Sequence, residues 1–272
     1  MPGETMELNL TLSQQALRGQ PITVTVVPLK APLPSIPLHR APKVILSTGN
    51  EEVDSRLGGG IPHPSLIAIE GDNGSGKTSI ALLLAQTYLR AGLSVAYFTN
   101  EGSSYTFISK AKESGFDLFG YFIGGSLRVY TMNVGIPVTR DTAERLLGAL
   151  AYVFTSGKLN FNAAVIDTLS YLSSAAPEGS IKMLFEALRK SADRGMSVVV
   201  TFHPNTLPKT LSEPIKATCD GYIRLSEASL GGRRLKVLTV VKFKGLPSGA
   251  QSSITFDVDP AFGIKVIPIV LS

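Results

Sequence analysis

Short apolar runs rich in β-branched residues alternate with longer amphipathic segments from about residue 43 to residue 202. The short runs are typical of buried strands, and the longer segments, with apolar positions three and four residues apart, are typical of helices. Such alternation predicts βαβ units, which build a parallel sheet covered by helices. We expect strands at residues 66–70, 94–99, 127–131, 162–167 and 196–202, and helices near residues 78–91, 103–114, 140–155 and 179–193.

The alternation of helix and strand stops after Phe202, and four strand-like runs follow without room for helices between them. Strands joined by short connections pair antiparallel. We therefore predict an α/β fold with a mainly parallel central sheet, flanked by helices and extended by antiparallel C-terminal strands. The four runs are residues 220–226, 235–243, 252–258 and 263–269.

The first 42 residues differ from the rest in composition, because they hold seven of the 17 prolines and end in APLPSIPLHRAP. Proline-rich sequence favours extended chain over packed helices. We expect an N-terminal arm over residues 1–42, with at most one strand at residues 22–27, and a single domain over residues 43–272.

Composition narrows the class of protein. The chain has 272 residues, 44% hydrophobic and 17% charged, which excludes a disordered or fibrous protein. Its single cysteine, Cys219, excludes an internal disulfide framework and predicts a reducing compartment. Glu4 and Glu7 stand where a signal peptide needs positive charge, and the longest apolar runs are too short to span a bilayer. The net charge of +5 permits a nucleic-acid contact without requiring one.

The stretch GDNGSGKT fits the phosphate-binding pattern GxxxxGK(S/T), between a predicted strand and a predicted helix. Its glycines let the loop curl so that backbone N–H groups and the helix N-terminus face a polyphosphate. Lys77 is placed to reach the β- and γ-phosphates, and the Thr78 hydroxyl to bind Mg²⁺. A glycine turn that only caps a helix is disfavoured, because strand, glycine spacing, Lys77 and Thr78 occur together. The predicted nucleotide-binding residues are Gly71, Asp72, Asn73, Gly74, Ser75, Gly76, Lys77, Thr78 and Ser79.

Three side chains follow predicted strands at the same carboxyl edge of the sheet. Asp167 ends an apolar strand and is the predicted acid for the Mg²⁺ water shell; the alternative is a helix N-cap. Glu101 is the candidate base that polarises an attacking water, with a surface-loop glutamate as the alternative. His203 could sense the γ-phosphate or be an ordinary loop histidine.

A basic segment lies between Arg224 and Lys244, with Glu227 as its acidic residue. Lys242 and Lys244 are two residues apart on a predicted strand and therefore project from one face. They could reach the γ-phosphate of a neighbouring subunit, although charge pattern alone favours a solvated strand face. The basic residues are Arg224, Arg233, Arg234, Lys236, Lys242 and Lys244.

With these residues placed, the chain from about residue 43 to 272 resembles the KaiC-like branch of the RecA superfamily. Within that branch it is most similar to the FlaH family, also called ArlH, the ATP-binding component of the archaeal flagellum (archaellum) motor. The resemblance lies in STGNEEVDSRLGGGIPHPS with EGDNGSGKT, in GGRRLKVLTVVKFKG, and in the ending FDVDPAFGIKVIPIVLS. It implies a RecA-like P-loop NTPase core with ATP and Mg²⁺ as ligands, Asp167 as the Walker B acid, and Lys242 and Lys244 as a basic pair acting across subunits.

The resemblance also implies partners and a location. These are a homo-oligomeric, hexameric ring in the ATP-bound state, docking to the motor ATPase FlaI (ArlI), and contact with the membrane platform and ring-scaffold proteins of the archaellum. The protein would then be cytoplasmic and peripheral at the membrane, with no nucleic-acid partner. The family usually has paired glutamates where this chain has Asn100 and Glu101. One carboxylate instead of two predicts slow or absent hydrolysis.

Two other functions remain open from the sequence. A DNA-dependent RecA-like ATPase of recombination or repair would use the basic segment, but such proteins generally add a helical module before the core, and residues 1–42 are too short and proline-rich to fold as one. A KaiC-like autokinase would phosphorylate Ser103, Ser104 or Thr106 beside Glu101. Hydroxyl residues in that position are more often helix caps.

Overall fold

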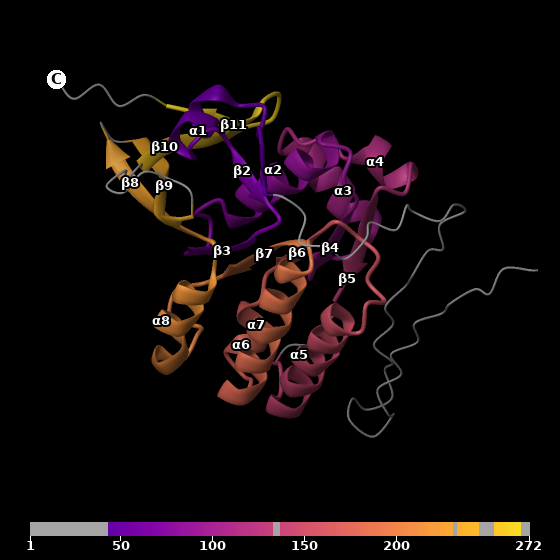
Figure 1. Ribbon diagram of the computed structural model, residues 1–272. Coiled ribbons are helices and arrows are strands. Elements are labelled where there is room, and N and C mark those ends of the chain that lie inside the picture. Colours follow the sequence, from indigo (N-terminus) through magenta and orange to yellow (C-terminus); the bar gives the residue numbers. More distant parts are fainter. Residues whose placement is uncertain (1–42, 133–136, 231–232, 245–252, 268–272) are drawn as a thin grey trace, which may run out of the picture.

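The computed structural model describes residues 43–132, 137–230, 233–244 and 253–267. Within these ranges the chain forms one large sheet and a small two-stranded sheet, with helices on both faces of the large sheet (Figure 1). The strands are β1 Val44–Leu46, β2 Ile61–His63, β3 Leu66–Gly71, β4 Val95–Thr99, β5 Leu127–Thr131, β6 Ala163–Asp167, β7 Ser197–Phe202, β8 Gly221–Leu230, β9 Arg233–Phe243, β10 Ser253–Asp259 and β11 Gly263–Val266. The helices are α1 Glu51–Arg56, α2 Lys77–Arg90, α3 Ser104–Glu113, α4 Phe119–Ile123, α5 Arg140–Thr155, α6 Ser170–Ser173, α7 Glu178–Asp193 and α8 Lys209–Thr218.

In the described part of the chain, the large sheet has nine strands in the order β11-β10-β9-β8-β3-β7-β6-β4-β5. The six strands from β8 to β5 run parallel, and β9, β10 and β11 add on antiparallel. Strand β3 lies inside the sheet, paired with β7 on one side and β8 on the other. This arrangement confirms the predicted α/β fold with a mainly parallel sheet and antiparallel C-terminal strands.

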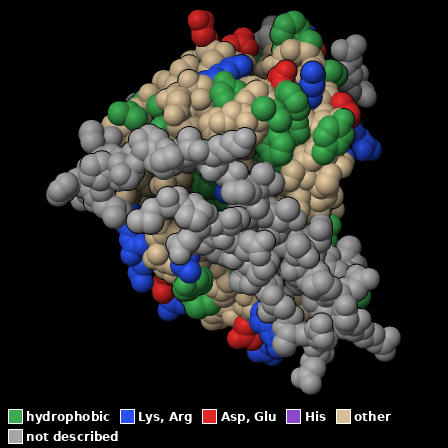
Figure 2. Space-filling view, turned by 90° about the vertical axis from the view of Figure 1, so that its right-hand side faces the viewer, with side chains coloured by type: hydrophobic (Ala, Val, Ile, Leu, Met, Phe, Trp, Pro, Cys, Tyr) green, Lys and Arg blue, Asp and Glu red, His purple; other side chains and the backbone are tan. Residues whose placement is uncertain are grey.

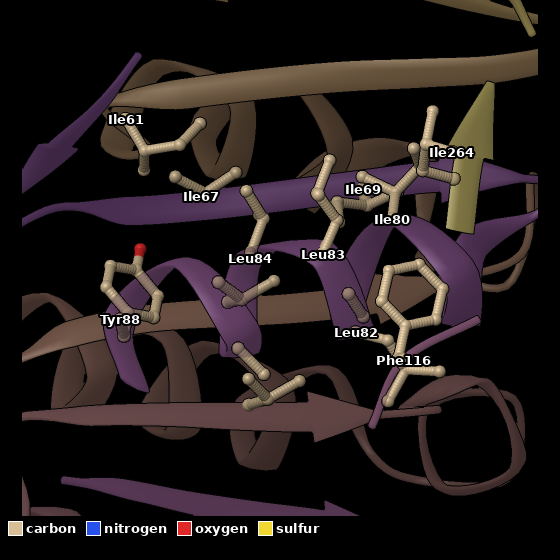
Figure 3. Packing of buried hydrophobic residues seen from close by; sticks show 14 of the residues in the cluster. Ile61, Ile67, Ile69, Ile80, Leu82, Leu83, Leu84, Tyr88, Phe116 and Ile264 are labelled. Carbon is tan, nitrogen blue, oxygen red and sulfur yellow. The ribbon is translucent and has the colours of Figure 1, made fainter. Parts of the chain in front are cut away.

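The two faces of the sheet carry separate hydrophobic clusters, as the twofold period of a strand requires. On β3, Ile67 and Ile69 belong to one cluster, whereas Leu66 and Ala68 belong to the other. Helices α2 and α3 pack on the first face, and α5, α7 and α8 on the second (Figure 1). Figure 3 shows the first cluster, in which Leu83 and Leu84 of α2 point toward β3. The central strands are therefore buried on both sides, which accounts for their uninterrupted apolar sequence.

One expectation for the C-terminal third was wrong. Helix α8 lies between β7 and β8, and β8 pairs parallel with β3, so the βαβ pattern continues one unit beyond Phe202. The helix was missed because Pro214 lies inside it and Ile215 is its buried residue. Proline is a strong helix-breaking signal, and one buried residue gives no amphipathic period. The antiparallel extension begins at β9.

The short elements α1, α4, β1 and β2 also escape the hydrophobic pattern, because none exceeds six residues. Helix α1 is fixed locally: the Asn50 side chain accepts a hydrogen bond from the Val53 N–H, which caps the helix N-terminus. The predicted arm, residues 1–42, and the predicted strand at residues 22–27 lie outside the described residues. None of the described helices combines the length and the apolar character needed to cross a membrane.

Candidate nucleotide-binding site

The loop between β3 and α2 lies at the carboxyl edge of the parallel strands, where α/β proteins bind ligands. Gly74 and Gly76 have φ angles of 79° and 94°, in the left-handed region that favours glycine. A Cβ atom at Gly71 would collide with the Ser75 hydroxyl and lie 2.8 Å from Leu225 Cβ. The three glycines therefore permit a tight curl that other residues would disrupt.

Lys77 is the first residue of α2, and its side chain turns back into the loop. Its Nζ donates a hydrogen bond to the Asp72 carbonyl oxygen at 2.7 Å. Burial lowers the pKa of Lys77, while Asp167 and Asp72 act to raise it. The ammonium thus lies in the loop at the positive end of a 14-residue helix, an arrangement that attracts a polyanion.

The Ser75 hydroxyl tests whether a polyphosphate fits this loop. Ser75 is completely buried, and its Oγ has no hydrogen-bond partner among the described residues. A buried hydroxyl without a partner is costly, so such groups mark places where a ligand or water belongs. With the glycine curl and Lys77, this orphaned hydroxyl gives a cradle that suits the phosphates of a nucleotide.

Asp167 lies at the end of β6, as predicted, and the structure shows that it is buried. Its Oδ1 accepts a hydrogen bond from Thr201 Oγ1 at 2.6 Å, and its Oδ2 accepts one from the Tyr97 hydroxyl at 3.0 Å. Burial, followed by the Asp167 charge, raises the pKa of Tyr97 well above its usual range, so the phenol stays a donor. The N-cap alternative does not hold, because Leu169 occupies the N-cap position of α6. The negative charge of Asp167 acts to raise the pKa of Lys77.

Glu101 follows β4, whose last residue Thr99 is in register with Asp167 of the neighbouring strand β6. The two carboxylates therefore lie at the same edge, as expected. The Glu101 side chain is 36% exposed, and its Oε2 accepts a hydrogen bond from Lys110 Nζ at 3.0 Å. The candidate base is thus paired with a cation from α3, and its part in catalysis stays a prediction.

His203 directly follows β7, and its backbone N–H donates to Ser170 Oγ at 2.6 Å. Burial and then the Lys77 charge lower the pKa of His203, while Asp72 and Asp167 raise it. These influences place the imidazole among the same charged groups as Lys77 and keep it neutral at pH 7. Its role as a γ-phosphate sensor stays a prediction.

Lys242 and Lys244 lie at the opposite edge of the sheet from the loop of their own chain. Lys242 is in register with Tyr222 near the start of β8, whereas the loop follows the end of β3. Lys242 Nζ donates to the carbonyl oxygens of Lys216 and Ala217 at the end of α8, at 3.0 and 2.7 Å. Any contact between these lysines and a bound phosphate would therefore require a second copy of the chain.

The hydroxyls proposed for an autokinase serve helix α3. Ser103 is its N-cap, and Ser103 Oγ accepts a hydrogen bond from the Thr106 N–H at 3.1 Å. Ser103 and Thr106 also share a hydroxyl–hydroxyl bond of 2.9 Å, and Ser104 Oγ donates to the Val129 carbonyl at 3.4 Å. These contacts are those of a capped helix start.

Two residues beside the loop were not predicted. A Cβ atom at Gly76 would lie 3.1 Å from Phe256 Cζ on β10 and 3.2 Å from Lys236 Cδ on β9. Lys236 Nζ lies 3.4 Å from Asp257 Oδ1. Spacing along the chain could not reveal these neighbours, because only the strand order β3-β8-β9-β10 brings them to the loop. Of the basic segment, Lys236 is thus the member that borders the phosphate loop of its own chain.

Comparison with known proteins identifies the family. Residues 46–270 match the family model of the KaiC ATPases. The archaeal flagellar ATP-binding protein FlaH of Sulfolobus acidocaldarius is 37% identical over 230 residues, which is 84% of this chain and 99% of that protein. The crystal structure of the flagellar accessory protein FlaH from Methanocaldococcus jannaschii has a TM-score of 0.68 at 25% identity, over 84% of this chain and 99% of that one.

A KaiC-like protein from Pyrococcus horikoshii shares the fold, with a TM-score of 0.64 at 18% identity, over 84% of this chain and all of that one. The family model covers most of the chain, and the Sulfolobus relative aligns over nearly its full length. The glycine loop, Lys77 and the buried Asp167 lie together at the carboxyl edge of the parallel strands. The chain therefore belongs to the KaiC ATPase family and, within it, to the FlaH proteins.

Proposed function

We propose that this protein is an ATP-binding component of the archaellum motor complex. In this proposal its ATP-bound state assembles into a homo-oligomeric, hexameric ring that the motor ATPase FlaI (ArlI) recognises. Contacts with the membrane platform and ring-scaffold proteins would hold it in the cytoplasm at the membrane. The observation that carries the proposal is the phosphate cradle, in which the glycine loop curls around the Lys77 ammonium and the buried Ser75 hydroxyl has no partner among the described residues. The relatives named above supply the cellular setting.

The residues of the chain divide the binding task. Backbone N–H groups of the glycine loop and the Lys77 ammonium hold the β- and γ-phosphates. Thr78 in the first turn of α2 and Asp167 at the end of β6 would hold Mg²⁺. The ion neutralises phosphate charge when it is bound. Tyr97 and Thr201 fix the Asp167 carboxylate by donating to its two oxygens.

Slow hydrolysis follows from the state of Glu101. A general base must lie within hydrogen-bond reach of the attacking water. Oε2 of Glu101 accepts a hydrogen bond from Lys110 at 3.0 Å, which biases the carboxylate toward α3, and the neighbouring position is Asn100 rather than a second acid. ATP binding is therefore the main event, and ATP turnover is a minor one.

The opposite placement of Lys242 and Lys244 supports a subunit-bridging role. If the carboxyl edge of one copy faces the amino edge of the next, the two lysines approach the γ-phosphate of the neighbour. The phosphate then links two subunits, and ADP, which lacks it, does not. This makes assembly depend on which nucleotide is bound.

The test starts with ATP·Mg²⁺ binding by the purified full-length chain, measured by titration calorimetry. Lys77→Ala is expected to weaken binding roughly tenfold to a hundredfold, because a charge-assisted contact with phosphate is lost. Lys182→Ala, an exposed lysine on α7, is the matched control and should bind as the wild type does. If Lys77→Ala binds ATP·Mg²⁺ as tightly as the wild type does, the assignment of the phosphate site is wrong.

The partner is tested by co-sedimentation with purified FlaI in ATP, in ADP and without nucleotide. The proposal is supported if the two proteins associate in ATP but not in the other two conditions, and if Lys77→Ala abolishes this association. Cells carrying Lys77→Ala should assemble no archaella. Strong hydrolysis stimulated by single-stranded DNA, together with no FlaI association, would instead identify a recombinase-like ATPase.

A further inference from the structure

Asp220 lies at the amino edge of the sheet and is surrounded by cationic side chains. It lies between α8 and β8, and its side chain is 2% exposed. Its Oδ2 accepts hydrogen bonds from the Leu66 N–H at 2.9 Å and from Arg189 at 2.6 Å. Its Oδ1 accepts one from Lys244 Nζ at 2.8 Å, and Lys43 Nζ lies 3.5 Å from the same oxygen. Lys244 is one of the two lysines for which a role in the neighbouring subunit's site is proposed above.

The two oxygens of Asp220 are held in different ways. Oδ2 is bound by a backbone amide and by Arg189, which also binds Asp193 at 2.8 Å and is only 22% exposed. Oδ1 is bound by two lysines whose side chains are about half exposed, 53% for Lys43 and 50% for Lys244. The arginine side is therefore fixed within the structure, and the lysine side opens to solvent.

Asp220 must remain charged and paired. Burial by itself would raise its pKa, but hydrogen bonds from Lys244, the Leu66 amide and Arg189 hold the pKa of this carboxyl well below its usual range. A buried carboxylate is destabilised when it loses a charged partner. Arg189 stays on Oδ2, and departure of Lys244 from Oδ1 costs least when another cation takes its place. Lys43 is already 3.5 Å away.

Lys242 differs in this respect. Its ammonium lies on the last carbonyl groups of α8, which are partial negative charges that solvent can also satisfy. Its departure leaves no buried carboxylate unpaired. The need for a replacement cation is thus specific to Lys244.

We propose that Asp220 is a positioning residue that exchanges Lys244 for Lys43. In the isolated chain Asp220 holds Lys244; when Lys244 turns to the γ-phosphate of a neighbouring copy, Lys43 closes onto Oδ1. This inference rests on the proposed nucleotide-dependent assembly. It assigns Lys43 a part in assembly.

The experiment measures assembly of the full-length chain in ATP·Mg²⁺ by sedimentation velocity over a range of protein concentrations. Lys244→Ala should abolish assembly, and Lys43→Ala should raise the concentration for half-assembly roughly tenfold, because release of Lys244 then leaves Asp220 short of one partner. ATP affinity of the unassembled chain should be unchanged in Lys43→Ala. Lys43→Arg keeps the cation and should assemble as the wild type does; Lys182→Ala is the neutral control.

Asp220→Asn adds a coupling test, since an amide needs no replacement cation. In that background Lys43→Ala should have no further effect on assembly. Because Asp220→Asn could disturb folding through Arg189, the comparison of Lys43→Ala with Lys43→Arg decides the question by itself, with thermal melting as a check on both.

The possible failures are distinct. Wild-type assembly by Lys43→Ala, while Lys244→Ala stays unassembled, would overturn the exchange and leave the proposed function standing. Equal weakening by Lys43→Ala and Lys43→Arg would also overturn it, because charge would not be the cause. Absence of ATP-dependent assembly in the wild type would end both the proposed function and the exchange.

Discussion

At the scale of single residues, the ion pair between Glu101 and Lys110 affects how readily the candidate base can reach an attacking water. The pair is partly exposed, so it contributes no more than about 1 kcal/mol. That is still enough to bias the carboxylate toward the lysine and away from a water near the γ-phosphate. Lys110 is therefore expected to restrain the candidate base rather than to assist it.

Removing Lys110 should release this restraint. We predict that Lys110→Ala raises single-turnover hydrolysis of ATP by a factor of about two to five, which corresponds to loss of an exposed ion pair. Glu101→Gln should keep ATP binding and lose residual hydrolysis, and the double variant should match Glu101→Gln. Radiolabelled ATP in excess protein gives the rates. Faster turnover by Lys110→Ala in the Glu101→Gln background would show that Glu101 is not the base.

At the scale of elements, helix α2 links the phosphate loop to the core. It begins at Lys77, and beyond its first turn nearly all of its residues are buried against the strands (Figure 3). Leu84 is one of the deepest, at 1% exposure. Helix α2 is thus held by packing along its length, and this packing also fixes the end of the phosphate loop that joins it.

We predict that Leu84→Ala lowers the free energy of unfolding by about 2–5 kcal/mol, because it removes buried methyl groups and leaves a cavity. Urea unfolding followed by circular dichroism gives the value. Met183→Ala on α7, where the side chain is 45% exposed, is the control and should change stability by less than about 1 kcal/mol. A loss below 1 kcal/mol for Leu84→Ala would contradict the packing described for this face.

Elements with a strong period could be predicted from the sequence. The segment NAAVID gave β6 within one residue, and the amphipathic segment at residues 140–155 gave α5 at its full length. Helix α8 could not be predicted, because Pro214 and a single buried residue hide its period. Because this helix was not predicted, β8 was expected to run antiparallel to the parallel strands, whereas it pairs parallel with β3.

The candidate site could likewise be predicted from the sequence only in part. The glycine loop is contiguous in sequence, and Asp167 ends an apolar strand, so both could be located from pattern and sheet geometry alone. The hydrogen bonds that Tyr97 and Thr201 make to Asp167, and the position of Lys236 beside Gly76, depend on strand order. No local pattern encodes strand order, and these neighbours became visible only in the folded chain.

At the scale of the whole molecule, the basic segment does not form one continuous surface. Arg224 binds Glu70 at 3.2 Å and Lys236 lies near Asp257, both toward the loop edge. Lys242 and Lys244 lie at the other edge, on α8 and on Asp220. On the face shown in Figure 2, Lys and Arg side chains are interspersed with Asp and Glu. This face therefore presents charges of both signs.

This distribution predicts weak contact with nucleic acid. Specific or processive DNA binding needs a stripe of unpaired cations along a groove, and several lysines and arginines here are occupied by carboxylates or helix carbonyls. We expect single-stranded DNA to bind no more tightly than roughly 1 μM at physiological salt, the range of non-specific contacts. Fluorescence anisotropy of a labelled oligonucleotide, with and without ATP·Mg²⁺, measures this. Because exposed ion pairs break readily, tight binding would mean that DNA displaces these carboxylates, and DNA-stimulated turnover would then follow from the release of Lys242 and Lys244.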